Sequence, residues 1–126
     1  MEKTVICEDY CSFEVARLLK EKGFDVFLPF GWGDNDKQPR TFIEDDGRGG
    51  WFDTKQKWLS CPTHQMAMKW LREKGVYIVI NPFFNNEPMT WWYSITTNKH
   101  YAEKTDFDTY EQAVEAALKY SLENLI

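Results

Sequence analysis

Apolar and polar positions follow the same order in two segments of the chain. Residues 18–28 read LLKEKGFDVFL, and residues 70–80 read WLREKGVYIVI. Each segment ends an amphipathic helix, reaches a glycine and continues as an apolar, β-prone run. Because the helix and the strand of each unit share one apolar side, we expect both units to pack on a common core. Leu19 and Leu71 are the matching core positions.

Capping residues and helical periodicity predict three helices. Serine or threonine, which can accept a hydrogen bond from an unpaired backbone N–H, stands at each expected start, and glycine ends the first two helices. These residues are Ser12 and Gly23 for the first helix, Pro62, Thr63 and Gly75 for the second, and Thr109 with Gln112, as a capping box, for the third. The expected inner stripe of the first helix is Val15, Leu18, Leu19 and Lys22. The apolar positions expected to be buried in the other two are Met66, Ala67, Trp70 and Leu71, and Tyr110, Ala113, Val114, Ala117, Leu118, Leu122 and Leu125.

Alternating or continuous β-prone residues predict strands at residues 24–30, 76–84 and 90–97, with a further short strand near His100. The glycine-rich stretch between the first strand and the second helix predicts turns, and we expect a hairpin there that pairs residues 40–44 with residues 51–55. Strands joined by short turns, beside helices that each need one covered side, predict an α+β fold. We therefore expect a single domain, 1–126, with an antiparallel sheet packed by three helices.

Three segments resemble small proteins encoded by Bacteroides-type bacteria and by their phages and integrated mobile elements. They read SFEVARLLKEKGF at residues 12–24, PTHQMAMKWLREKGVYIVI at residues 62–80 and TYEQAVEAALKYSLENLI at residues 109–126. These motifs are helix faces and caps, so the resemblance implies a fold and a genomic setting. No activity and no catalytic residues are carried over with it.

Composition narrows the classes of function. The chain of 126 residues is 43% hydrophobic, which is enough for a packed core. Its formal net charge of −5 disfavours general binding to nucleic acid. An odd cysteine count, with no leader-like start and no apolar run of membrane-spanning length, favours a reduced cytoplasmic compartment and no membrane association.

Two constellations could carry chemistry. Cys7, Cys11, Cys61 and His64 have the donor types and paired spacing of a zinc site, C-x3-C with C-x2-H. Their two pairs would converge if the starts of the first two helices were neighbours. The competing interpretation is small buried cysteines plus a surface histidine. Cys61 with His64 could instead be a thiol and base, although no third orienting group is evident.

A nucleic-acid site is the second alternative function. From Pro62 onward the predicted order of elements resembles the double-stranded-RNA-binding domain, which contacts phosphates from the start of its last helix. Here that start is acidic, at residues 106–111, so Lys99, His100 and Lys104 would have to supply the phosphate contacts.

Aromatic residues make up 17% of the chain, with six tryptophans. Tryptophan and tyrosine dominate protein-binding hot spots, so Trp32, Trp51, Trp58 and Trp92 are candidates for a recognition surface. The competing interpretation places Trp51 and Trp58 in a second small core. The leading hypothesis is a non-enzymatic, cytoplasmic protein-binding module that needs no cofactor. Its partner is an unidentified protein, and the apolar last helix could also support a homodimer.

Overall fold

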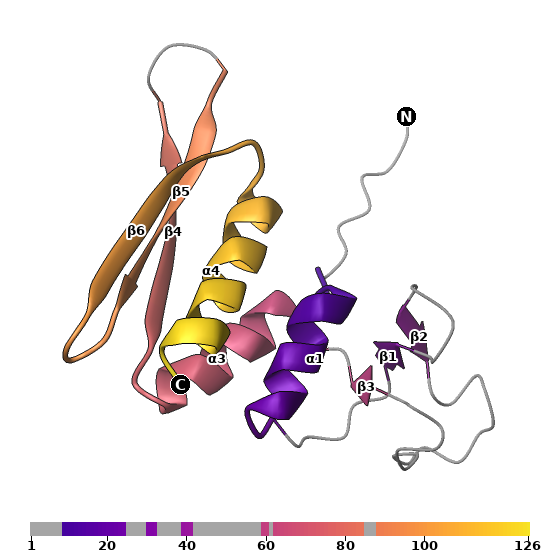
Figure 1. Cartoon of the computed structure of the whole chain (residues 1–126). Coiled ribbons are helices and arrows are strands. Elements are labelled where there is room, and N and C mark those ends of the chain that lie inside the picture. The colour runs from indigo at the N-terminus through magenta and orange to yellow at the C-terminus, as the bar shows by residue number, and fades with distance from the viewer. Residues whose placement is uncertain (1–8, 25–29, 33–38, 42–58, 61, 85–87) are drawn as a thin grey trace, which may run out of the picture.

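The computed structural model describes residues 9–24, 30–32, 39–41, 59–60, 62–84 and 88–126. Its elements are α1 (Phe13–Glu21), β1 (Phe30–Trp32), β2 (Pro39–Thr41), β3 (Leu59–Ser60), α3 (His64–Glu73), β4 (Tyr77–Phe83), β5 (Thr90–Thr96), β6 (Tyr101–Phe107) and α4 (Tyr110–Asn124). Along the described part of the chain, three antiparallel strands follow α1 and three more follow α3, before the last helix (Figure 1). Within these residues the predicted α+β class, with three helices and an antiparallel sheet, is confirmed.

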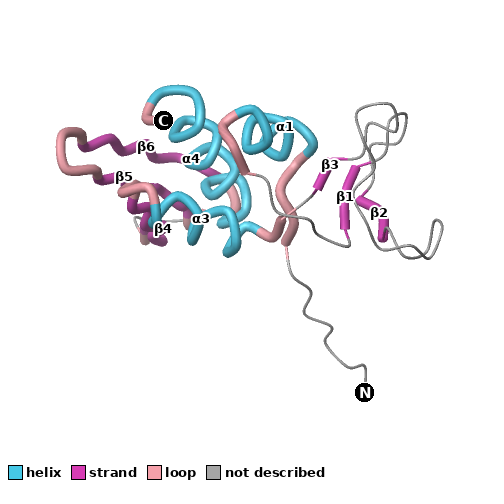
Figure 2. Tube along the Cα trace, turned by 90° about the horizontal axis from the view of Figure 1, so that it is seen from below, coloured by secondary structure: helices cyan, strands magenta, loops and turns pink. Residues whose placement is uncertain are grey.

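The main sheet has the strand order β4-β5-β6 and is antiparallel throughout. Helix α4 lies along one face of this sheet and contacts all three strands, while α3 contacts β4 and α1 packs on α4. Figure 2 shows the described helices on that same side of the sheet. The small sheet, in the order β2-β1-β3, lies beyond α1.

The repeated sequence unit folds the same way twice at the helix ends. The two glycines that end α1 and α3 have φ values of 102° and 86°, a left-handed conformation that glycine adopts without a Cβ penalty. The next residue then donates its N–H back to the last buried leucine: Phe24 to the Leu19 carbonyl and Val76 to the Leu71 carbonyl, each at 2.9 Å. This is the 6→1 hydrogen bond of a Schellman motif, and the apolar residue that makes it is buried in both copies.

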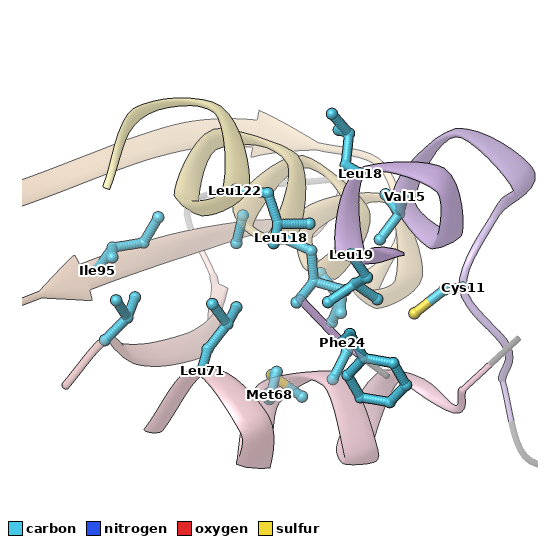
Figure 3. Packing of buried hydrophobic residues seen from close by; sticks show 14 of the residues in the cluster. Cys11, Val15, Leu18, Leu19, Phe24, Met68, Leu71, Ile95, Leu118 and Leu122 are labelled. Atoms are coloured by element: carbon cyan, nitrogen blue, oxygen red, sulfur yellow. The ribbon is translucent and has the colours of Figure 1, made fainter. Parts of the chain in front are cut away.

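One hydrophobic cluster joins α1, α3, β5 and α4, and Leu19 and Leu71 are both fully buried in it (Figure 3). The expectation that the two units share a core is therefore confirmed for their helices, while most of the strand expected in the first unit lies outside the described residues. One apolar position expected in the core is wrong: Met66 is 40% exposed, whereas Met68 is 6% exposed. Ala67 and Leu71 both face the core. Met68 lies about one helical turn before Leu71, so its side chain lies on the same buried face of α3.

Helix α4 follows its predicted apolar stripe closely. Five of the seven expected residues are fully buried and two are partly buried. The fully buried ones are Ala113, Val114, Ala117, Leu118 and Leu122. At its start the Gln112 N–H donates to Thr109 Oγ1 at 3.1 Å, as a capping box requires. The Gln112 side chain, however, accepts from the Asp108 N–H, one residue before the position expected.

The strands predicted for the main sheet are recovered. Strands β4 and β5 match the expected ranges to within a residue, and β6 is longer than the short strand expected near His100. In the central segment, Arg40 pairs with Gly31 of β1. The expected partners of residues 40–44, and most of the strand expected at residues 24–30, lie outside the described residues.

Candidate functional site

The face of the main sheet away from the helices carries exposed aromatic and apolar side chains. Successive residues of a strand point to opposite faces, and Tyr93 and Ile95 of β5 are buried in the core. Their neighbours Trp92, Ser94 and Thr96 therefore point to the other side. We call this side the open sheet face; its large exposed residues are Tyr77, Val79, Phe83 and Tyr101, with exposed fractions of 51%, 51%, 47% and 61%.

Strand register arranges these side chains in rows across the sheet. Tyr77, Thr96 and Tyr101 are direct neighbours on β4, β5 and β6, so two tyrosines flank a threonine at one end of the face. Towards the middle, Val79 is paired with Ser94. Cross-strand neighbours lie about 5 Å apart, which makes the row one contiguous surface.

Trp92 extends this surface toward the other end of the sheet, opposite Asn81. Its neighbour Trp91 makes an edge-on contact with Tyr110 of α4, with ring centroids 5.4 Å apart. Because consecutive strand residues alternate, Trp92 belongs to the open sheet face. Trp91 therefore faces the helices, and both tryptophans are partly buried.

A β-bulge lies on β6 opposite Trp92. The register shifts between Trp91 and Tyr93, so β6 contributes one extra residue there. Within it Asp106 has φ 72°, a conformation that aspartate tolerates better than most residues. The bulge interrupts regular pairing along the outer strand of the sheet.

The open sheet face has an acidic group at the β6 side. The Tyr101 hydroxyl donates to Glu103 Oε2 at 3.0 Å. This hydrogen bond from the phenol to the carboxylate is the main reason that the pKa of Tyr101 is raised above its ordinary value. Glu103 is also next to Ser94 in the register, so its charge borders the middle of the face.

A second polar cluster lies at the helix starts, inside the fold. The chain before α1 runs antiparallel to the chain before α3: the Cys11 N–H donates to the Pro62 carbonyl and the His64 N–H to the Asp9 carbonyl. The two helix starts are therefore neighbours. From α4, Glu115 reaches both of them.

Glu115 accepts two hydrogen bonds through the same oxygen. His64 Nε2 lies 2.7 Å and the Ser12 N–H 3.0 Å from Glu115 Oε2. Since a carboxylate can only accept, Nε2 is the protonated ring nitrogen in this contact. The other ring nitrogen, Nδ1, is buried and has no hydrogen-bond partner within the described part of the chain.

Two opposing effects act on the pKa of Glu115. Burial raises it, because the low-dielectric interior disfavours the carboxylate, but the hydrogen bonds from His64 and Ser12 outweigh burial. The net result is a pKa below the ordinary value. The carboxylate therefore favours the folded state near neutral pH, and the cluster acts as a clamp between three helices.

The predicted zinc ligands are only partly described. Cys7 and Cys61 lie outside the described residues. Cys11 is fully buried, with its Sγ 3.9 Å from the Thr63 carbonyl oxygen, and His64 is 4% exposed rather than a surface histidine. Within the residues that the structure describes, no three His, Cys, Asp or Glu side chains are grouped to hold a metal ion. The His64 partner is a carboxylate that sequence spacing did not suggest.

Two of the three predicted phosphate-binding residues line the same cavity. Lys99 and His100, in the β5–β6 turn, line a cavity of about 470 Å³ that also includes Lys74 from the end of α3. The Lys74 ammonium lies 4.7 Å from the centre of the Trp70 ring. Lys104 stands apart on β6, with its ammonium 5.9 Å from the Phe107 ring.

Of the four tryptophans predicted to form a recognition surface, only Trp92 has a described side chain. Trp92 is on the open sheet face, Trp32 belongs to β1 without a described side chain, and Trp51 and Trp58 lie outside the described residues. The exposed residues of β4 and β6 were not among the predicted site residues. The alternation in YIVINPF could have predicted the exposed residues of β4. Ile78 and Ile80 pack on the core, and the alternate residues Tyr77 and Val79 face outward.

Comparison with known proteins leaves the fold without an assigned relative: no family model, no curated protein and no solved structure matches the chain. None of the helices in the described residues combines the length and the apolar character needed to cross a membrane.

Proposed function

We propose that this protein is a non-enzymatic binding module that engages a protein partner through the open sheet face. The observation that carries the proposal is the row Tyr77–Thr96–Tyr101, whose two tyrosines are more than half exposed. Tyrosine supplies a large rigid contact area at low entropy cost, and exposed aromatic groups on a flat surface are typical of interface centres. A folded sheet backed by three helices would present this surface without prior ordering.

Charge indicates the chemistry of the partner. Near the centre of the face the residues are apolar, aromatic or uncharged, and Glu103 borders them on the β6 side. A complementary protein would bring an apolar centre with lysine or arginine at its rim. Such a rim would place a cation near the Tyr101–Glu103 hydrogen bond.

The test is to measure affinity for a partner identified by co-purification. Tyr77→Ala and Tyr101→Ala remove exposed rings without opening the core, so both variants should fold. Each should weaken binding roughly tenfold or more, as expected for hot-spot tyrosines. Met66→Ala is the matched control, because Met66 is an exposed apolar residue on α3. Unchanged affinity in both tyrosine variants would disprove the proposal.

A nucleic-acid-binding module is the second candidate. It is favoured by the element order α3-β4-β5-β6-α4, which is the order compared above with the double-stranded-RNA-binding domain, and by the cavity lined by Lys74, Lys99 and His100. It is disfavoured by the acidic start of α4. If it is correct, affinity for a duplex should fall steeply with salt, and a Lys99→Ala variant should show a shallower salt dependence.

A further inference from the structure

The two edges of the main sheet differ in their protection against pairing with another strand. Strand β6 carries Glu103, Lys104 and Asp106, and Asp106 is part of a bulge. Charged side chains and bulges are the usual means of blocking an exposed edge. Strand β4 reads YIVINPF and has no charged side chain. Strand β6 therefore has the usual protection of an edge, and no described strand covers the uncharged edge of β4.

The open edge has the backbone groups that a further strand needs. Among the described strands, β4 pairs only with β5, through all seven of its residues. In an antiparallel strand, alternate residues direct both N–H and C=O to the same side, so about half of the β4 backbone groups face away from β5. Pro82 lacks an N–H and limits pairing at one end. The stretch from Tyr77 to Asn81 remains available.

We propose that β4 pairs antiparallel with β4 of a second copy of this chain, so that the two main sheets become one continuous sheet. A two-fold axis makes this pairing self-complementary, because each copy offers the same donors and acceptors. Each molecule has a net charge of −5, which opposes association through its charged surfaces. The uncharged β4 edge is where that opposition is weakest.

The side chains of β4 support the pairing on both faces. Ile78 and Ile80 are partly buried against the core, and Val79 is half exposed on the open sheet face. A paired strand would cover their remaining apolar surface. It would also join the two open sheet faces side by side, although the dimer does not depend on the binding role proposed above.

The area buried between the two β4 strands indicates how tightly the dimer should form. A single strand edge of this length buries less than the roughly 1,200 Å² of total surface that stable interfaces usually bury. We therefore expect a concentration-dependent dimer with a Kd of about 1–100 μM. Sedimentation velocity over concentrations that bracket this range should show one species converting into another of twice the mass.

Val79→Lys is the variant that tests the edge. Its side chain is exposed in the single chain, so the fold should survive, which far-UV circular dichroism can verify. Val79 is the centre of the stretch from Tyr77 to Asn81, so the two-fold axis of the dimer would pass beside it. The two introduced lysines would then face each other across the axis, and the Kd of the dimer should rise roughly tenfold. Thr96→Lys is the matched control: it adds the same charge to the same face on the central strand, and the Kd should not change.

Amide hydrogen exchange gives a second readout. Exchange at residues 77–81 should slow with increasing protein concentration, while β6 amides should be unaffected. A monomer at every concentration would overturn the proposal, and so would a dimer that Val79→Lys leaves intact. Equal weakening by Val79→Lys and Thr96→Lys would also overturn it, because that result indicates stacking of two sheet faces.

Discussion

His64 on α3 and Glu115 on α4 are joined at 2.7 Å, Nε2 to Oε2, where the helices pack together. The same Glu115 oxygen accepts the Ser12 N–H, one of the backbone donors at the start of α1 that have no partner within the helix. One carboxylate therefore fixes three helices at a point where their starts and sides meet. Buried polar contacts of this kind are costly to break, because each partner is left without water or a hydrogen bond.

Removing either partner should destabilise the fold. His64→Ala leaves the Glu115 carboxylate with one hydrogen bond fewer in a poorly solvated position, and we expect a loss of about 2 kcal/mol in the free energy of unfolding. Urea denaturation of His64→Ala, Glu115→Ala and the double variant should give a clear coupling energy. The exposed pair Glu14–Lys119 also links α1 to α4, at 2.8 Å, and provides the control. Its coupling should be much smaller, and equal couplings would contradict the clamp.

The lowered pKa of Glu115 predicts a pH dependence with a definite sign. Because its folded-state pKa lies below the ordinary value of 4.5, the folded protein binds fewer protons there than the unfolded chain. The resulting stabilisation is complete above the unfolded pKa and is lost as the pH falls through the folded one. The difference in urea midpoint between wild type and Glu115→Gln should therefore shrink below about pH 4.5. A difference that stays constant down to pH 2 would refute this assignment.

The matched glycines should respond alike to substitution. Nothing lies within 4 Å of a Cβ added at Gly23 or Gly75, so the cost is purely that of the left-handed backbone. Gly23→Ala and Gly75→Ala should each lose about 1 kcal/mol in thermal or chemical unfolding. Asparagine at the same positions should cost less, since it tolerates this conformation. A much larger loss at one site would mean that the two helix ends are not equivalent.

The two matched leucines should be equally important to one core. Leu19→Ala and Leu71→Ala each create a cavity among fully buried neighbours, and we expect losses of about 2–5 kcal/mol. Each variant should still unfold in a single transition that is followed equally by tryptophan fluorescence and far-UV circular dichroism. Met66→Ala, at an exposed position of α3, should change stability by less than about 0.5 kcal/mol. Two separate transitions would show that the repeated units do not share an interior.

Local signals predicted much of the helical layer. Ser12, Thr63 and Thr109 cap their helices, and each side chain accepts from the backbone N–H three residues on. These contacts depend on neighbours in the sequence, so residue type and spacing suffice to predict them. The stripe of α4 was predictable for the same reason, since a period of 3.6 residues marks one face regardless of what covers it.

Contacts between distant residues were not predictable in this way. Glu115 is an ordinary helix glutamate in the sequence, and its contacts with His64 and Ser12 span 51 and 103 residues. The exposed row of Tyr77 and Tyr101 likewise depends on strand register. Alternation divides a strand into two faces, but it does not say which one the helices cover.

The sequence alone determined where the helices and the two main strands begin and end, and that the matched leucines would be buried. Those features follow from capping, backbone conformation and periodicity, all of which act over a few residues. Only the tertiary structure decided that His64 would be buried against a carboxylate, and that one face and one edge of the main sheet would be left uncovered by the described helices and strands. These outcomes depend on how the layers pack, because packing determines which side of each element loses its water.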